Sequence, residues 1–142
     1  MSARVVAAAR GWIGTPYMHQ ASVRGVGTDC LGLVRGVWAE LFGREPERVP
    51  AYGPDWGETG SVELLLDAAG RHLERRRGGE AEAGDVLLFR MREGGIAKHL
   101  GIAAETGSRP TFIHAYSGHA VVESPLSSPW ERRVVARFGW PF

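Results

Sequence analysis

The sequence predicts an α+β fold in which helices come first and an antiparallel β-sheet follows. Two observations carry this prediction. Up to Gly70, apolar residues recur at helical spacing, whereas beyond it short β-prone stretches alternate with turn residues. The links between those stretches are too short for parallel crossovers, so an antiparallel meander is expected. Helices followed by strands are typical of the α+β class.

Three segments are predicted to be helical: residues 2–13, residues from about 29 to 42, and residues 61–70. Gly43 ends the second of them, and Ser61 caps the third. The side chains expected to face the core are Val5, Val6, Ala9, Trp12 and Ile13 in the first helix, Leu31, Val34, Val37, Trp38 and Leu41 in the second, and Leu64, Leu65 and Ala68 in the third.

The predicted strands all lie in the second half of the chain. They are residues 85–90, 98–104, 111–116, 119–123 and 133–138. With 142 residues and no linker or repeat, the sequence predicts one domain spanning 1–142, long enough to bury a core without disulfides or metals.

Charge and composition exclude several classes of partner. The formal net charge is +1, so no overall field favours nucleic acid or an anionic membrane. No stretch approaches the roughly 20 apolar residues of a membrane span. Arg4 and Arg10 break the apolar run at the N-terminus, so we expect synthesis in the cytoplasm without a signal peptide.

Cys30 is the single cysteine and stands at the predicted start of the second helix. Unpaired backbone N–H groups and the helix dipole at such a position favour a thiolate, and they can also hold an oxyanion. We therefore expect a Cys30 thiol with a lowered pKa. The alternative is that Cys30 is simply a small buried hydrophobic residue.

Two histidines on neighbouring predicted strands can complete a nucleophilic site. Alternation places His99, Gly101 and Ala103 on one strand face, and small residues beside His99 leave room above it for a substrate. His114 lies on the next strand and can pair with His99, so that one imidazole takes the cysteine proton and the other orients it. A structural role for either histidine is the alternative.

Other polar and aromatic candidates carry weaker signals. A zinc site from Cys30, His99 and His114 is conceivable but lacks a close-spaced ligand pair. Of the remaining residues, His19 can line the cleft near Cys30, His72 and His119 are expected in solvent, and Trp130 and Trp140 are expected to be exposed.

Five segments occur in an order that resembles the NlpC/P60 family. They are GTPY (14–17), GTDCLGLV (27–34), AGDVLLFR (83–90), KHLGIA (98–103) and FIHA (112–115). The resemblance implies a papain-like α+β fold whose helix begins at the cysteine and packs on an antiparallel sheet.

The resemblance also implies a role for each matching residue. Cys30 corresponds to the nucleophile, His99 to the base and His114 to the third, orienting residue. Tyr17 corresponds to a tyrosine that points into the cleft, and Asp29 to the polar residue before the cysteine; both are candidates for substrate binding. The implied activity is an endopeptidase that cuts peptidoglycan stem peptides beside D-glutamate, with no metal or organic cofactor.

Departures from the common family pattern suggest a subgroup. Leu31-Gly32 replaces the frequent Ser-Gly, Met18-His19-Gln20 replaces a Trp/Gly-rich run, and the segment 43–82 is longer than in many members. Together with the missing leader, this resembles enzymes of phage tails and gene transfer agents. We therefore expect tail-tip proteins as partners and a virion or phage-like particle as the location.

Two alternatives to a peptidoglycan endopeptidase stay open. The chain can be a structural or adaptor subunit of a tail assembly with little or no hydrolase activity. It can also be an amidase or acyltransferase that uses the same residues on another amide or thioester.

Overall fold

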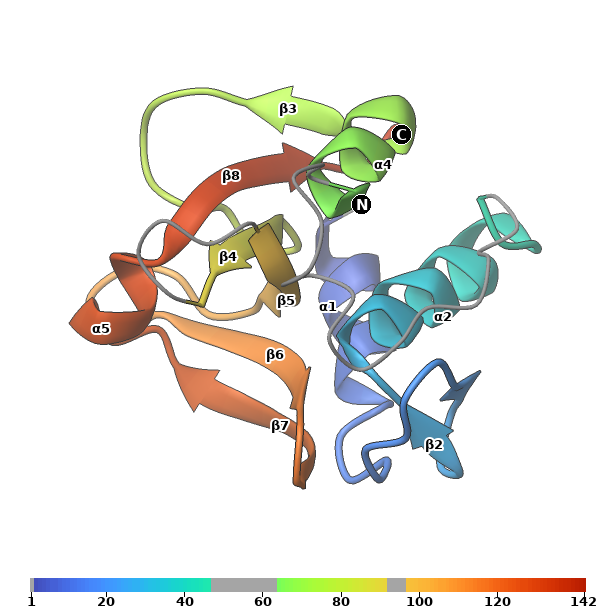
Figure 1. Ribbon diagram of the computed structural model, residues 1–142. Helices are drawn as coiled ribbons and strands as arrows, with labels where there is room; N and C mark the ends of the chain where they lie inside the picture. The colour runs from blue at the N-terminus through green and yellow to red at the C-terminus, as the bar shows by residue number, and fades with distance from the viewer. Residues whose placement is uncertain (1, 47–63, 92–96) are drawn as a thin grey trace.

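The computed structural model describes residues 2–46, 64–91 and 97–142. Within these ranges the chain forms helices early and a sheet late (Figure 1). The elements are α1 (Ser2–Arg10), β1 (Ser22–Val23), β2 (Gly27–Thr28), α2 (Cys30–Phe42), α4 (Leu64–His72), β3 (Glu74–Arg76), β4 (Val86–Arg90), β5 (Ala97–Ala103), β6 (Thr111–Tyr116), β7 (His119–Pro125), α5 (Ser128–Glu131) and β8 (Val134–Gly139).

The main sheet has six strands in the order β3-β8-β4-β5-β6-β7, and each neighbouring pair is antiparallel. A separate two-stranded hairpin, β1-β2, precedes α2. Short connections between sequence neighbours account for the meander from β4 to β7. The predicted α+β class and antiparallel pairing are confirmed.

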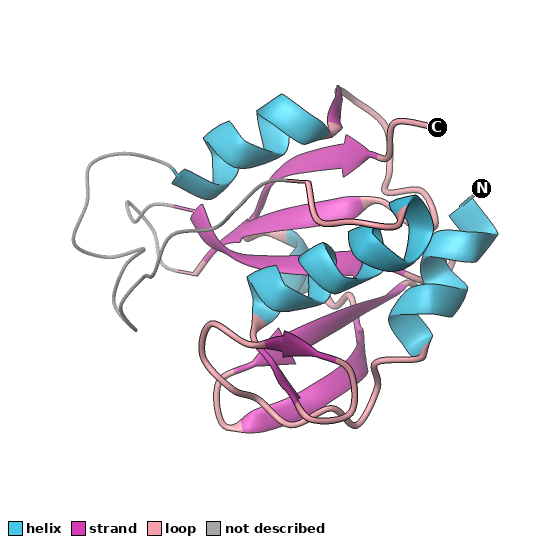
Figure 2. Ribbon diagram, turned by 90° about the vertical axis from the view of Figure 1, so that its right-hand side faces the viewer, coloured by secondary structure: helices cyan, strands magenta, loops and turns pink. Residues whose placement is uncertain are grey.

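The longer helices pack on one face of the sheet. Figure 2 shows α2 in front of the strands, α1 beside it near the N-terminus and α4 along the top of the sheet. Alternation along the strands turns Leu88, Leu100, Ile102 and Ile113 toward these helices. They meet Val5 and Ala9 of α1, Leu33 and Val37 of α2, and Leu65 of α4.

The opposite sheet face carries a smaller cluster of Leu87, Phe89, Ala103, Phe112 and Leu126. The half-buried Trp130 of α5 covers this cluster, and Figure 1 shows α5 on the far side of the strands from α1 and α2. Side chains therefore cover both faces of the central strands, which explains the nearly continuous burial along β4 and β5.

Several boundaries and orientations differ from expectation. The first helix stops at Arg10 rather than residue 13, because Gly11 and Gly14 favour a turn. Leu33 rather than Leu31 is fully buried in α2, and Ala69 rather than Ala68 in α4. The proposed cap at Ser61 lies outside the described residues, as do residues 61–63 of the third predicted helix.

The short elements β1, β2, β3 and α5 were not predicted, because two to four residues give no readable periodicity. Trp140 is buried, not exposed, and its indole N–H donates to the Gly84 carbonyl oxygen at 2.7 Å. Over the ranges that the structure describes, every helix is too short or too polar to cross a membrane.

The contact between Gly36 of α2 and Trp12, which follows α1, generates a first prediction. A Cβ on Gly36 would lie 2.1 Å from the Trp12 ring, whose indole N–H is held by Glu40 at 3.0 Å. We expect Gly36→Ala to lower the free energy of unfolding by about 1–3 kcal/mol, despite the better helix propensity of alanine. Urea unfolding followed by circular dichroism measures this change.

Gly70→Ala in α4 is the matched control, since a Cβ at this position would point into open space. It should raise stability by up to about 1 kcal/mol. Equal effects of the two substitutions would contradict the close contact between Gly36 and Trp12.

Candidate active site

Asp29 fixes the position at which α2 begins. Its backbone is extended (φ −106°, ψ −173°), and its carboxylate accepts from the backbone N–H of Gly32 at 2.7 Å and of Gln20 at 2.8 Å. One side chain thus caps the helix and anchors the preceding loop. Cys30 follows as the first helical residue, as the sequence predicted.

Gly32 allows the loop to close over the first turn of α2. A Cβ at this position would lie 2.0 Å from the carbonyl oxygen of Ala21 and 2.6 Å from Thr28 Oγ1. The Gly32 carbonyl oxygen also accepts from the Ser22 hydroxyl at 2.7 Å. The loop bearing Tyr17 and the turn bearing Cys30 are therefore held as one unit.

The Cys30 sulfur lies against the backbone of β5. Register pairs join β5 to β6 at Ile102–Ile113 and Ala103–Phe112, at the C-terminal end of β5. Toward the other end of β5, Cys30 Sγ donates to the Lys98 carbonyl oxygen at 3.7 Å, and the Leu100 N–H points to the sulfur. The sulfur thus sits beside the backbone on either side of His99.

The pKa of the Cys30 thiol is raised to about 12, opposite to the expected direction. Burial is the main cause, and the negative charge of Asp29 adds to it. The N–H groups of Leu100, Leu31 and Cys30 favour the thiolate but do not outweigh these effects. The helix terminus alone predicts a thiolate, but burial and the Asp29 charge act in the opposite direction and prevail.

The two histidines form a buried pair, as predicted. His99 Nε2 and His114 Nδ1 are 2.9 Å apart, and the side chains belong to residues only 6% and 3% exposed. His114 Nε2 in turn lies 3.0 Å from the Ser124 hydroxyl on β7. The result is a chain of three polar side chains running across β5, β6 and β7.

Both imidazoles are neutral at pH 7. Burial lowers the pKa of His99 to about 3, and the charges of His114 and Lys98 add to the effect. Burial also lowers the pKa of His114 to about 4, with a contribution from His119. The site therefore holds a neutral thiol and neutral bases rather than a preformed ion pair.

Aromatic rings occupy the face that was expected to be open to substrate. A Cβ on Gly101 would lie 2.8 Å from the Phe112 ring, so the small residue at 101 makes room for Phe112. The Trp130 indole lies 5.7 Å from the His99 ring and 5.2 Å from the His114 ring. The expectation of free space above His99 is wrong, because neighbouring side chains fill it.

Tyr17 lies close to the nucleophile candidate. Burial raises the pKa of Tyr17, and the charges of Cys30 and Asp29 raise it further, which places its hydroxyl within electrostatic reach of both. His19 Nδ1 is 3.9 Å from the Asp29 carboxylate. The structure thus gathers Tyr17, His19, Asp29 and Cys30, with Asp29 3% exposed and bonded to backbone.

The remaining histidines lie elsewhere. His119 is exposed and stacks on Tyr116, as expected for a solvated residue. His72 is half-buried with its ring edge 6.1 Å from Trp38, contrary to the solvated position predicted for it. In the part of the chain that the structure describes, no three His, Cys, Asp or Glu side chains are grouped to hold a metal.

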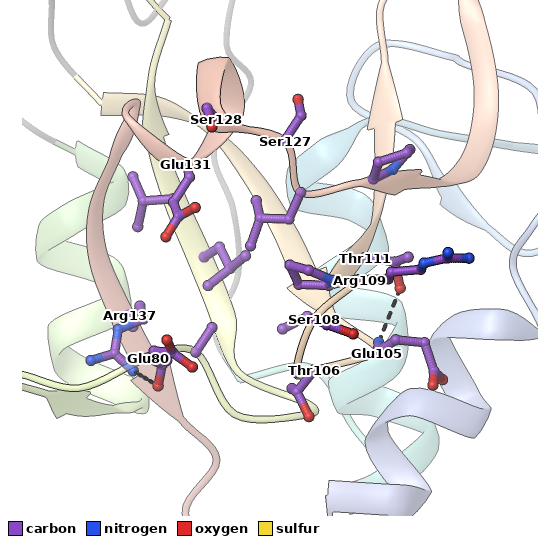
Figure 3. Close-up of a pocket in the computed structure, with 18 of the residues that line it drawn as sticks. Glu80, Glu105, Thr106, Ser108, Arg109, Thr111, Ser127, Ser128, Glu131 and Arg137 are labelled. Carbon is purple, nitrogen blue, oxygen red and sulfur yellow. Dashed lines mark hydrogen bonds between the residues drawn. The ribbon is translucent and has the colours of Figure 1, made fainter.

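A separate cavity of about 760 Å³ lies on the sheet face covered by α5 (Figure 3). Leu87, Ala103 and Leu126 line it together with charged residues such as Glu131 and Arg137. Arg137 donates to the Glu80 carbonyl oxygen at 2.7 Å, which ties β8 to the preceding loop. Cys30, His99 and His114 are not part of the described lining.

The fold agrees with comparisons to known proteins. The profile of the NlpC/P60 family matches residues 14–138. The chain belongs to the NlpC/P60 family, a family of cysteine peptidases. No curated protein matches the sequence.

Solved structures show the same fold. The NlpC/p60 domain of the peptidoglycan hydrolase SagA matches with a TM-score of 0.63 and 24% identity, over 98% of each chain. An NlpC/P60 family protein from Bacillus cereus ATCC 10987 matches with a TM-score of 0.68 and 17% identity, over 99% of this chain and 40% of that one. A lipoprotein-like NLP/P60 family protein from Staphylococcus aureus matches with a TM-score of 0.65 and 19% identity, over 99% of this chain and 41% of that one.

Two residues of the site were missed in the sequence. Ser124 reaches His114 only through the β6–β7 register, and Trp130 reaches the histidines through the unpredicted helix α5. Neither has a motif of its own. A cross-strand pairing scheme for residues 111–125 is the signal that points to Ser124.

The raised thiol pKa generates a prediction about reactivity. We expect the rate of Cys30 alkylation by iodoacetamide to keep rising with pH well beyond the ordinary thiol pKa of about 8.5. Asp29→Asn should lower the pH at which the alkylation rate is half-maximal, because removing a nearby negative charge favours the thiolate. This pH is the midpoint of the alkylation curve. Mass spectrometry of the alkylated protein across pH measures both midpoints.

Asp67→Asn, which removes an exposed carboxylate from α4, is the matched control and should leave the midpoint unchanged. Steric burial slows alkylation but does not move its midpoint. A wild-type midpoint well below the ordinary value would show that the thiolate is already formed, against this account.

Proposed function

We propose that the chain is a cysteine endopeptidase that hydrolyses amide bonds in peptidoglycan stem peptides. One observation carries the proposal: the Cys30 sulfur, at the start of α2, lies against the backbone that flanks His99, and His99 is bonded to His114 at 2.9 Å. Nucleophile, base and orienting residue are the three parts of a thiol acyl-transfer site. Membership in the NlpC/P60 family supports the same substrate class.

In the proposed mechanism, proton transfer accompanies attack. The thiol proton of Cys30 passes to His99 Nδ1, since Nε2 is engaged by His114. The sulfur then bonds to the scissile carbonyl carbon, and the backbone N–H groups of Cys30 and Leu31 stabilise the oxyanion. A neutral base and a neutral thiol suit this concerted route.

The second half of the reaction reverses the proton transfers. His99, now protonated, donates to the leaving amine as the C–N bond breaks and a thioester remains on Cys30. His99 then takes a proton from water, whose oxygen attacks the thioester carbonyl, and the sulfur leaves as the thiol. Tyr17 and Asp29, gathered beside Cys30, border the side from which substrate arrives.

Digestion of purified stem peptides tests the proposal. We expect wild-type protein to cut the amide between D-glutamate and the diamino acid. The masses of the two fragments should together exceed the mass of the substrate by one water. Cys30→Ala should abolish cleavage, because the nucleophile is lost, and His99→Gln should reduce it by roughly a thousandfold or more. Mass spectrometry identifies the bond.

His72→Gln, on α4 beside Trp38, is the control histidine variant and should cleave at the wild-type rate. Cleavage that survives in Cys30→Ala rules out the mechanism. If wild type cleaves no stem peptide but alkylates at Cys30 and turns over another amide or thioester, the substrate class is wrong and the amidase or acyltransferase alternative takes its place.

We further propose delivery as part of a phage-like tail, on the basis of the Leu31-Gly32 and Met18-His19-Gln20 departures from the common pattern. Particles purified from the producing cells should contain the chain at a few copies per tail, measured by quantitative mass spectrometry. Its absence from such particles would reject this route. Its presence without stem-peptide cleavage would favour a structural or adaptor subunit.

A further inference from the structure

We infer that Ser124 is a positioning residue, whose hydroxyl accepts a hydrogen bond from His114 Nε2 and thereby directs the His114 Nδ1 lone pair at His99. The inference deepens the proposed function, because it concerns the base of that reaction. It extends the nucleophile–base–orienter set by a fourth residue.

The β6–β7 register brings the two side chains together. Ser124 lies directly opposite Phe112, while His114 lies opposite Val122, so Ser124 is the diagonal neighbour of His114 on the same face. The His114 ring leans along β6 over Phe112, with 4.2 Å between ring centroids. This lean brings Nε2 to 3.0 Å from Ser124 Oγ.

The donors and acceptors available on His99, His114 and Ser124 fix the direction of the hydrogen bonds between them during the reaction. When His99 has taken the thiol proton, both of its nitrogens carry hydrogen, so Nε2–H must donate to His114 Nδ1. His114 Nδ1 can accept only if its own proton is on Nε2. That Nε2–H then needs an acceptor, and Ser124 Oγ provides it.

The reverse direction is unproductive. If Ser124 donates to His114 Nε2, then His114 Nδ1–H donates to His99 Nε2, and the proton of neutral His99 is forced onto Nδ1, where it blocks transfer from Cys30. No proton travels along the chain in either case; the bonds only choose the tautomer. An accepting hydroxyl therefore selects the form of His99 that can act as a base.

The charges near the His99–His114 pair make the uncharged Ser124 hydroxyl important as an acceptor. Lys98 on β5 and His119 on β7 act on the pair with positive or potentially positive charge, and Arg133 lies over the Trp130 ring at 5.7 Å. Cys30 on α2 supplies the counter-charge only after it is deprotonated. With both imidazoles buried, water is a poor substitute for the Ser124 oxygen.

The tautomers of His99 and His114 in the wild-type protein are the first test. Nitrogen-15 NMR of the ring nitrogens at neutral pH should show both histidines protonated at Nε2. In Ser124→Ala, His114 should shift toward the Nδ1–H form, because a buried N–H without an acceptor is costlier than a bare lone pair. Ser124→Thr keeps the hydroxyl and should restore the wild-type pattern.

Kinetics on stem peptides give the second readout. Ser124→Ala should lower kcat and kcat/KM together by about tenfold with KM unchanged, since the bond matters most once His99 is protonated. Ser124→Thr should recover most of the rate. Ser127→Ala is the matched control, because Ser127 is exposed and makes no side-chain cap bond to α5.

A wild-type His114 protonated at Nδ1 overturns the inference without any variant. So does a Ser124→Ala protein with unchanged tautomers and rate, or a Ser124→Thr protein as impaired as Ser124→Ala. The tautomer readout needs no substrate, so a failure of stem-peptide cleavage counts against the proposed function alone.

Discussion

The close contact between the first turn of α2 and the loop before it is the constraint on which the site depends. Only glycine at position 32 permits this contact, because any side chain would overlap the Ala21 carbonyl oxygen. The contact lets a single carboxylate, that of Asp29, bind backbone on both sides. Tyr17, His19 and Cys30 are thereby held beside one another, and the sulfur is set against β5.

The second half of the site lies between β5 and β6. Register pairs at Ile102–Ile113 and Ala103–Phe112 hold one end of the two strands together, and toward the other end of β5 the Cys30 sulfur lies against the Lys98 carbonyl oxygen. The two imidazoles meet at 2.9 Å between the same two strands.

Burial keeps Cys30, His99 and His114 uncharged in the resting site. The same desolvation that raises the pKa of Cys30 lowers the pKa of His99, so both protonation equilibria move away from the thiolate–imidazolium pair. When a substrate binds, its carbonyl and amide groups take the place of water and provide polar groups that this buried site lacks. The rings of Trp130 and Phe112 cover His99 and His114 and exclude water from them.

The sequence by itself determined the α+β class, the antiparallel meander, the start of α2 at Cys30 and the pairing of His99 with His114, because these follow from local periodicity, capping chemistry and short connections. Tertiary structure alone decided the rest. The direction of the Cys30 pKa shift depends on burial and on Asp29; the filling of the space above Gly101 depends on Phe112; the approach of Trp130 and Ser124 depends on α5 and the β6–β7 register. Each is set by contacts between residues distant in the chain or on different strands, which hydrophobic patterns do not encode.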